Sequence, residues 1–600
     1  MRNSCCFACL IFLFLPIIKA DLYSLAELTQ QVREVIESSA KYRFPENNNE
    51  HFANLDPEKQ DYGTFDFIIV GGGTSGGVLA NRLTEHKSFK VLVLEAGSAD
   101  PNTAAILGIH NYMINNIWNW GFNTTPQNNS CLISNKICRF PRGKVLGGSS
   151  ELNGALHVRG NRRDYDRWAE IVGNKSWSYK SVLPYFRKSE HASAFHPKDK
   201  KYHGSEGPQS ISLAPAVPGL TEAVIQGFKN LHYKVVDYNG KSQEGCGMVQ
   251  SYLNYNIRSG SNYSFFRPAI KRPNLTISLK SFVTKVILEG KTAVGVEFVK
   301  EGKTFFAKAS NEVIMSAGAV SSPQVLMLSG IGPTDELNKH GIEVVADLPV
   351  GKHLSEHVIL TNAMTLSTNT VFYNVTLDQA MDLWSKRQGP FMANVGRVIA
   401  FKDFNGDKLA DAELFFGFPL NIDPSGNFIV NSVAPYIQVM QPHSEGEVTL
   451  KSSDPRDFPL INPNLLGDER DFEQMYEAVK VLLDLNGTLP IKLISSNRGF
   501  SIVDFPKSHE CSLCCQKFSK KWWFCLFKYY SSCGFHPIGT TRMGKNSSDS
   551  VVDSDLKVHG IKNLRVVDAG IMPRLNSGHT NAPVVMIAEK ISDVIKNAYY

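Results

Sequence analysis

Residues 65–97 contain Phe65-Asp66-Phe67-Ile68-Ile69-Val70, then Gly71-Gly72-Gly73-Thr74-Ser75-Gly76-Gly77, an apolar-periodic stretch, and Lys90-Val91-Leu92-Val93-Leu94-Glu95. This order predicts a buried strand, a glycine turn, a helix and a second buried strand that ends in an acid. Gly71, Gly73 and Gly76 form the pattern G-x-G-x-x-G, and Glu95 lies 19 residues beyond Gly76. The stretch therefore predicts a dinucleotide-binding unit.

The residue types suit that ligand. The glycines permit a tight turn and a close approach of backbone N–H groups, and the helix N-terminus at Thr74 and Ser75 offers free donors to a pyrophosphate. Glu95 would accept from ribose hydroxyls, and its charge argues against a 2′-phosphate. A glycine triplet alone also occurs in plain strand–helix turns, but both strands and the acid fall in place here. No second such pattern occurs, so we expect one dinucleotide, held permanently.

Composition indicates an ordinary globular protein. The chain has 600 residues, 42% apolar and 20% charged. Residues 1–20 differ, because Arg2 precedes an apolar run that is too short for a membrane span and ends near a small residue, Ala20. This predicts a signal peptide and a secreted product with no membrane span. Its removal takes away Arg2 and Lys19, so the net charge falls from +6 to +4, which gives no indication of nucleic-acid binding.

Cysteines and glycosylation motifs agree with secretion. Eight of the eleven cysteines follow the leader, and an even number in a secreted chain favours disulfides. Cys131 and Cys138 could pair with each other; the cluster from Cys511 to Cys533 superficially resembles a zinc site, but disulfides are favoured and no metal is expected. Eight N-x-S/T motifs imply glycans at some of them. They begin at Asn123, Asn128, Asn174, Asn262, Asn274, Asn374, Asn486 and Asn546.

The fold class predicted is α/β, with a discontinuous dinucleotide-binding domain and an inserted substrate domain of antiparallel sheet and helices. We expect a leader (1–20), an extension with a helix near Leu25 to Ala40 (21–61), a cofactor region with inserted segments (62–360), a substrate domain (361–535) and a C-terminal return (536–600). Residues 312–318 predict a buried strand, after which Ser322 fits a helix N-cap and Pro323 the first helical position. Residues 564–570 predict one more buried strand that ends in an acid.

Two stretches carry a resemblance to a known family: Gly143-Lys-Val-Leu-Gly-Gly-Ser-Ser150 with Asn153-Gly154, and Ser316-Ala-Gly-Ala-Val-Ser-Ser-Pro through Gly332-Pro333. Together with Phe535-His536-Pro537 and Asn576-Ser-Gly-His579-Thr-Asn581-Ala-Pro583, they resemble the glucose–methanol–choline family of FAD oxidoreductases. The likeness covers roughly residues 62–598. The leader and the segment from Gly160 to Asp166 are similar to secreted insect members of the glucose dehydrogenase and salicyl alcohol oxidase types.

The resemblance implies FAD as the cofactor and assigns residues to it. Gly71, Gly73 and Gly76 would hold the pyrophosphate, Glu95 the adenosine ribose and Val283 the adenine. The remaining assignments lie at the flavin. They are Arg142, Gly148, Ser149 and Asn153 in a loop over the flavin, and Asp568 and Ala569 beside the ribityl chain and ring.

The sequence departs from the family in a few places. Some relatives tether FAD through a histidine that would align with Leu152, so FAD should be non-covalent here. Glu151 stands where a small or neutral residue is more common, and it could alter electrostatics near the flavin. In the segment after His536, Thr540 and Thr541 stand where a cysteine is common in the family. Glu356 stands where the family more often has an aspartate.

Alcohol oxidation needs a base for the hydroxyl proton while the flavin receives the hydride. The resemblance indicates His536 as the base and His579 as the partner that hydrogen-bonds the substrate oxygen; His157, His357 and His559 we expect to be structural. The predicted function is oxidation of a primary aryl or allylic alcohol with O₂ as acceptor. The alternatives are a glucose dehydrogenase that passes electrons to a quinone or dye, and a catalytically silent FAD-binding protein.

Overall fold

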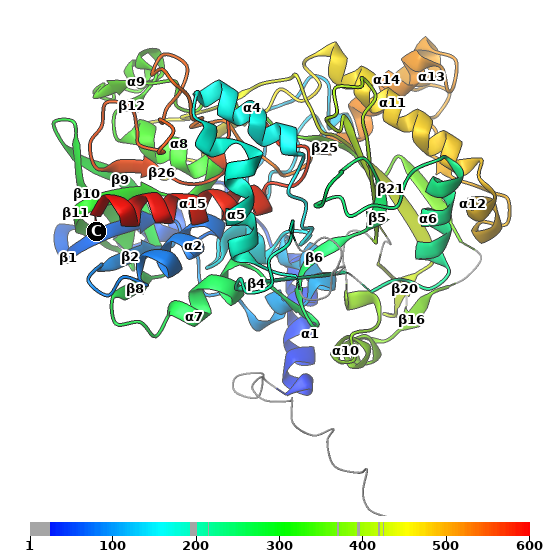
Figure 1. Cartoon of the computed structure of the whole chain (residues 1–600), viewed down its shortest axis with the longest axis horizontal. Coiled ribbons are helices and arrows are strands. Elements are labelled where there is room, and N and C mark those ends of the chain that lie inside the picture. Colours follow the sequence, from blue (N-terminus) through cyan, green and yellow to red (C-terminus); the bar gives the residue numbers. More distant parts are fainter. Residues whose placement is uncertain are drawn as a thin grey trace, which may run out of the picture.

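The structure is a computed structural model of the chain, and it describes residues 24–192, 201–213, 215–368, 371–392, 397–417, 420–423 and 425–599. The segment predicted to be a signal peptide, residues 1–20, lies outside the described residues. Two large sheets lie side by side, the first on the left of Figure 1 and the second on the right. The site described below lies between them.

The first sheet has seven strands and is built around the long strand β1 (Asp56–Val70). Val70 at its carboxyl end is in register with Leu94 of β2 and Met315 of β11, so the glycine turn leaves the sheet where its neighbours also end. The parallel part adds β8 (Leu275–Ser278), β2 (Val91–Leu94), β11 (Lys303–Met315) and β26 (Leu564–Val566), and the antiparallel part adds β10 (Thr292–Lys300) and β9 (Ser281–Glu289). Strands from distant parts of the chain thus form one sheet, which confirms the predicted α/β class.

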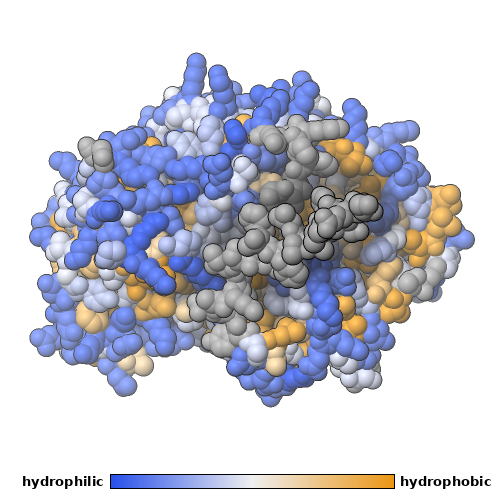
Figure 2. All heavy atoms as spheres, turned by 60° about the horizontal axis from the view of Figure 1, so that its bottom comes forward, coloured by the Kyte–Doolittle hydropathy of each residue, from blue (hydrophilic) through white to orange (hydrophobic). Residues whose placement is uncertain are grey.

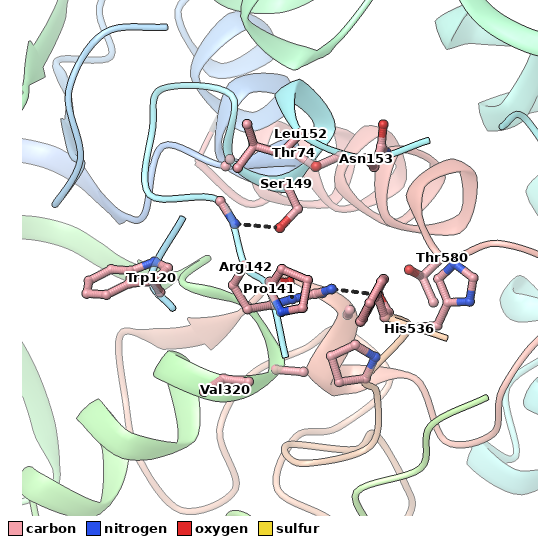
Figure 3. A pocket seen from close by; sticks show the side chains of 18 of the residues that line it. Thr74, Trp120, Pro141, Arg142, Ser149, Leu152, Asn153, Val320, His536 and Thr580 are labelled. Atoms are coloured by element: carbon pink, nitrogen blue, oxygen red, sulfur yellow. Dashed lines mark hydrogen bonds between the residues drawn. The ribbon is translucent and has the colours of Figure 1, made fainter. Parts of the chain in front are cut away.

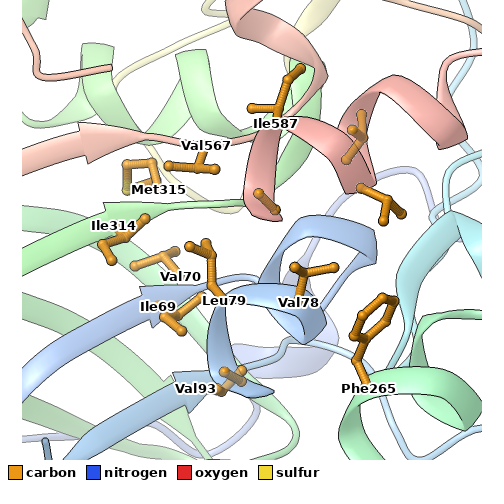
Figure 4. Close-up of a cluster of buried hydrophobic side chains, with 14 of the residues drawn as sticks. Ile69, Val70, Val78, Leu79, Val93, Phe265, Ile314, Met315, Val567 and Ile587 are labelled. Atoms are coloured by element: carbon orange, nitrogen blue, oxygen red, sulfur yellow. The ribbon is translucent and has the colours of Figure 1, made fainter. Parts of the chain in front are cut away.

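Two helices cover one face of this sheet. Val78 and Leu79 of α2 (Thr74–Leu83) pack between the strands and Ile587 of α15 (Asn581–Tyr599), and all three are buried (Figure 4). A two-pronged ion pair joins the helices: the Arg82 guanidinium donates to both oxygens of Glu589 over 2.8 Å. The continuous apolar strands follow from burial on both faces, as expected of a parallel sheet.

The second sheet has eight strands and is antiparallel. Its central strand β21 (Ser432–Val439) pairs with β18 (Ala412–Gly417), β14 (Val358–Leu360) and β15 (Met364–Ser367). The sheet is completed by β5 (Gly245–Met248), β17 (Val398–Lys402), β24 (Ser501–Ile502) and β25 (Ser531–Cys533). Helix α11 (Glu469–Asn486) packs on β21 and β18.

The remaining elements of the described residues range from two-residue strands to the 17-residue helix α1. The other helices are α1 (Leu25–Lys41), α3 (His110–Met113), α4 (Arg162–Val172), α5 (Tyr179–Ser189), α6 (Leu220–Asn230), α7 (Arg267–Ala269), α9 (Thr334–Lys339), α10 (Leu377–Ser385), α12 (Leu489–Ile494), α13 (Glu510–Cys514) and α14 (Lys520–Tyr530). The other strands are β3 (Glu190–His191), β4 (Gln209–Leu213), β6 (Gln250–Asn254), β7 (Ile257–Arg258), β12 (Ile331–Gly332), β13 (Ala346–Asp347), β16 (Tyr373–Val375), β19 (Asn421–Ile422), β20 (Phe428–Val430), β22 (Glu447–Thr449) and β23 (Leu460–Asn462). The helix predicted in the N-terminal extension is α1, and Ser24 and Glu27 form a capping box at its start.

One predicted helix start is wrong. Helix α8 (Gly318–Leu328) begins at Gly318 with Ala317 as its N-cap, rather than at Pro323 with Ser322 as its N-cap, so Pro323 lies inside it. The Gly318 N–H is capped from afar, because Asp568 Oδ2 accepts it over 2.9 Å. Pro323 has no N–H to donate to the Ala319 carbonyl, and the Thr540 hydroxyl donates to that oxygen instead, over 2.8 Å.

The cysteines after the leader mostly form disulfides. Cys131–Cys138 is present as expected, and the C-terminal cluster contributes Cys511–Cys525 and the adjacent pair Cys514–Cys515. Cys246 and Cys533 are free and buried. The disulfide prediction is therefore confirmed for three pairs.

The glycosylation motifs divide by exposure. Asn262 is buried and donates to Asp100, and the Asn274 amide donates to three backbone carbonyls, so neither offers a free amide. Four motifs have an exposed asparagine: Asn123, Asn128, Asn374 and Asn546.

The face of the molecule in Figure 2 is largely hydrophilic, with separate apolar groups. Among the described helices we find none with the length and hydropathy of a membrane span.

Candidate active site

A cavity of about 500 Å³ separates the glycine turn of the first sheet from the second sheet. Most of the residues predicted from the sequence line it. They are Gly71, Gly73, Thr74, Ser75, Glu95, Arg142, Gly148, Ser149, Asn153, Val283, His536, Asp568, Ala569 and His579. Gly76 does not line the cavity. It packs against the glycine turn, where a Cβ on Gly76 would stand 2.1 Å from the Gly71 carbonyl oxygen. Figure 3 shows Trp120 and His536 at opposite ends of the cavity.

The glycine turn is shaped for a ligand that approaches the backbone. Gly71 has φ +102°, and a Cβ there would stand 2.5 Å from the Ser316 carbonyl oxygen. Gly148 has φ +59°, and its Cβ would stand 2.7 Å from Gly73 Cα. Only residues without a Cβ fit at both points. They bring two glycine loops together at the N-terminus of α2, where backbone donors face the cavity, and this cradle fits the pyrophosphate of a dinucleotide.

Glu95 ends β2 and is fixed by the backbone. Its Oε2 accepts the Gly72 N–H and its Oε1 accepts the Gly97 N–H, both over 2.8 Å. Burial raises the pKa of Glu95 to about 7, although both hydrogen bonds oppose that shift. The carboxylate keeps lone pairs for ribose hydroxyls, as its predicted role requires.

Asp568, after β26, organises its end of the cavity. Besides the cap on α8, its Oδ2 accepts the Ser322 hydroxyl over 2.6 Å, and its Oδ1 accepts the Gly570 N–H over 2.8 Å. Burial raises the pKa of this carboxyl. Asp568 therefore fixes the turn that carries Ala569 into the cavity.

The second glycine loop forms another wall. The Ser149 hydroxyl accepts the Gly143 N–H over 3.0 Å, and the buried Arg258 guanidinium donates to both the carbonyl and the side-chain oxygen of Asn153. Leu152 also lines the cavity. These contacts hold the backbone of the loop in place from both sides.

Glu151 does not line the cavity, although the neighbouring Ser149 and Leu152 do. Its Oε1 accepts the Asn262 N–H over 2.9 Å, and its side chain occupies the space where Gly260 has no Cβ. Burial raises the pKa of Glu151 to about 7. The side chain packs at the start of the π-helical turn Asn262–Phe266, away from the cavity lining.

His536 follows β25, and its ring is oriented by a second histidine. His357, which precedes β14, has its Nδ1 3.0 Å from His536 Nδ1, and its Nε2 lies 3.3 Å from the Met440 carbonyl oxygen. Burial lowers the pKa of His357 to about 3, and burial together with the neighbouring histidines and Arg142 holds that of His536 well below its ordinary value. Both rings are therefore neutral at pH 7.

The proton positions follow from these contacts. A carbonyl oxygen only accepts, so His357 Nε2 carries the hydrogen and its Nδ1 is an acceptor. Two donors face that atom, His536 Nδ1 at 3.0 Å and the Gln438 amide nitrogen at 3.2 Å, and when His536 Nδ1 is the donor, His536 Nε2 keeps a free lone pair. His357, which we expected to be structural, contacts His536 directly and so orients its ring.

His579 completes the histidine pair. Its ring centroid lies 4.6 Å from that of His536, and its Nε2 lies 2.9 Å from Glu413 Oε1. Glu413 is on β18, is fully buried, and its Oε2 has no partner among the described residues. An acid in an otherwise apolar strand was the signal available in the sequence, and it was missed.

A buried acid, Glu356, also holds the backbone of His536 in place. Glu356 Oε1 accepts the His536 backbone N–H over 2.7 Å, and its Oε2 has no partner among the described residues. Burial raises the pKa of Glu356 to about 8, against the effects of that hydrogen bond and of the nearby Arg142. Arg142 donates to the Phe535 carbonyl over 2.7 Å (Figure 3). The peptide group between Phe535 and His536 is thus fixed at both its N–H and its carbonyl oxygen.

The floor beside the histidines is aromatic. Phe415 of β18 and Tyr436 of β21 are directly opposed across the sheet, and their rings stack at 4.8 Å with planes 12° apart. Ile359 and Gln438 line the cavity on the same sheet. None of these residues was predicted to line the site. Side chains on neighbouring strands can be placed together only when the register of the strands is known.

Comparisons with known proteins agree with this geometry. Models of the family described as GMC oxidoreductase match residues 65–359 and 442–588. A glucose dehydrogenase (FAD, quinone) of Drosophila pseudoobscura pseudoobscura is 36% identical over 551 residues, covering 89% of this chain and 87% of the relative. An ecdysone oxidase of Spodoptera littoralis is 32% identical over 581 residues, covering 89% and 92%. A solved variant of Aspergillus oryzae formate oxidase has a TM-score of 0.78 at 28% identity, covering 90% of this chain and 99% of that structure.

Proposed function

This chain belongs to the GMC oxidoreductase family, and on that basis we propose that it oxidises a primary alcohol of the aryl or allylic type to its aldehyde. As a member of the family it is an FAD-dependent oxidoreductase that acts on CH–OH groups. Bound FAD supplies the acceptor for the hydride of the alcohol carbon at its N5 atom. The residues around the cavity fit FAD at the glycine cradle and at Glu95.

The 3.0 Å contact between His536 Nδ1 and His357 Nδ1 is the observation that carries the proposal. A neutral imidazole with Nδ1 engaged by His357 presents a lone pair that can take the hydroxyl proton of an alcohol. Because its pKa lies below the ordinary value, this nitrogen is ready to accept a proton throughout the neutral range. His536 is therefore proposed as the general base.

His579 is proposed to hydrogen-bond the same substrate oxygen. As the hydroxyl proton leaves, negative charge develops on that oxygen, and the proposed donor to it is His579 Nδ1, the ring nitrogen that Glu413 does not contact. Glu413 keeps the His579 ring in place through the 2.9 Å contact to Nε2. The two histidines and Glu413 would thus act as one unit.

The aromatic floor supports the substrate class. A planar ring or an allylic chain can lie against Phe415 and Tyr436, whereas a sugar would leave several hydroxyls beside apolar surface. The glucose dehydrogenase relatives favour the second candidate, oxidation of glucose with a quinone acceptor. O₂ remains the acceptor proposed here.

The proposal also includes non-covalent binding of FAD and secretion of the protein. Leu152 lines the cavity where some relatives carry a tethering histidine, and a leucine cannot form that bond, which supports non-covalent FAD. The leader, three disulfides and exposed glycosylation motifs support secretion. The division at residues 62, 360 and 536 stays a prediction.

The test is a substrate screen on protein secreted from insect cells. Benzyl alcohol, cinnamyl alcohol and glucose would each be assayed once for peroxide and once with a quinone or dye. The proposal expects peroxide from the aryl and allylic alcohols and little turnover of glucose. Turnover of glucose with the quinone and none of the aromatic alcohols would replace it with the second candidate, and a folded, FAD-loaded protein inert to all alcohols would refute both.

A further inference from the structure

The segment between α1 and β1 lies across one end of the cavity. Asn48 lines the cavity and is 3% exposed. Its N–H donates to the Arg456 carbonyl over 2.7 Å, so this part of the segment is tied to a loop between β22 and β23. A residue from outside both sheets therefore forms part of the wall.

Aromatic contacts fix the segment against β9. The His51 ring stacks on Phe282 at 4.9 Å with planes 25° apart, and Phe52 meets the same ring edge-on at 5.7 Å. Phe282 and Val283 both line the cavity. Burial lowers the pKa of His51 to about 4, so the ring is neutral at pH 7 and packs as an apolar surface.

Charge and packing fix the segment to the second glycine loop. Glu50 pairs with Lys144, whose ammonium also lies 4.9 Å from the Trp120 ring centre. A Cβ at Gly121 would stand 2.4 Å from the Phe44 ring, so that glycine makes room for the segment. Trp120 marks the end of the cavity opposite His536 (Figure 3), so these contacts lie away from the reacting groups.

Helix α1 anchors the segment on its other side. The Ser38 hydroxyl accepts from the Asn116 amide over 2.7 Å, and Val32 and Val35 are buried. The helix contacts α3, whose His110 lines the cavity, and α10 (Figure 1). With α1 before it and β1 after it, the segment is held at both ends.

We propose that residues 42–54 form a clasp that closes the adenosine end of the FAD site and slows release of the cofactor. The clasp joins three separate walls, which are β9, the second glycine loop and the loop at Arg456. The backbone of Lys144 lies against Gly97, where a Cβ would stand 2.1 Å from the Lys144 carbonyl oxygen, and the Gly97 N–H donates to Glu95, so the clasp lies beside the residue proposed to bind the adenosine ribose. The inference needs FAD binding only and is independent of the substrate.

The test measures FAD release from the holoprotein without any alcohol. His51→Ala removes the ring stacked on Phe282, and Asn48→Ala removes the side-chain amide that donates to the Pro455 carbonyl at the cavity wall. Flavin fluorescence after dilution would follow release, and each variant is expected to lose FAD about tenfold faster than the parent. Glu46→Ala, at an exposed site in the same segment, is the matched control and should release FAD at the parent rate.

A second measurement separates a clasp from general packing. FAD raises the unfolding midpoint by binding the folded state, and weaker binding shrinks that increase. The clasp predicts a smaller difference between FAD-saturated and FAD-free midpoints in both variants. The proposal would be overturned if the variants released FAD at the rate of the Glu46→Ala control. It would also be overturned if the difference between their FAD-saturated and FAD-free unfolding midpoints were as large as in the parent. If His51→Ala does not fold, Asn48→Ala decides by the same two measurements.

Discussion

Replacing Glu413 should separate activity from stability. Its Oε1 lies 2.9 Å from His579 Nε2, in a fully buried position. A hydrogen bond to a charged group contributes about 1.5–3 kcal/mol, roughly twice a neutral one. Glu413→Gln keeps the shape but loses the charge, so about 1.4 kcal/mol and tenfold in the rate of flavin reduction should be lost. Glu413→Ala removes the contact altogether, and about a hundredfold loss is expected.

Glu413→Gln should slow flavin reduction without lowering the thermal stability of the protein. Glu413 Oε2 has no partner among the described residues, so burying this oxygen carries a desolvation cost that the contact of Oε1 with His579 does not offset. Glu413→Gln should therefore leave the unfolding midpoint unchanged or raise it. Rapid-mixing absorbance of the flavin and thermal unfolding are the assays, with Glu244→Gln, an exposed acid paired with Lys402, as control. Parent-rate flavin reduction in Glu413→Ala would refute the role given to this acid.

Three further predictions follow from the site and the surface. The rate of flavin reduction should stay constant from pH 8 down to pH 6.5 and fall only below that, because the pKa of His536 lies below the ordinary histidine value; a fall centred above pH 6.5 in a pH–rate profile would contradict this. Acid precipitation should release all flavin into the supernatant, since Leu152 cannot tether it, and yellow protein in the pellet would show otherwise. Mass spectrometry of the secreted protein should find Asn262 and Asn274 unglycosylated, whereas a glycan on either would mean that the buried amides become accessible. The same spectra should find glycans among Asn123, Asn128, Asn374 and Asn546.

The cofactor half of the fold could be read from the sequence because its signals are local. Strand, glycine turn, helix and acid follow one another within residues 65–97, and each has its own periodicity or steric requirement. The start of α8 was misread because a local signal, Ser322 followed by Pro323, competed with a distant one. Asp568, 250 residues away, caps the helix at Gly318, which lies before the predicted first helical residue Pro323.

The substrate half was beyond sequence reasoning for a different reason. Glu413, Phe415 and Tyr436 face the site because β18 and β21 pair in one register, and a shift by one residue would turn each of them away. His357 is brought to His536 by the pairing of β14 with β25. Such pairings join residues far apart in the chain, so a single sequence gave no means of placing them.

The most direct test of the account is the reduction of bound flavin by alcohol in His536→Ala. Loss of a positioned base should slow this step roughly 10²–10⁴-fold. The variant should retain FAD, because the glycine cradle and Glu95 lie at the other end of the cofactor. His536→Ala/His579→Ala should be little slower than the poorer single variant, since the two histidines act together. A His536→Ala protein that keeps its FAD and reduces it at the parent rate would contradict the assignment of the base.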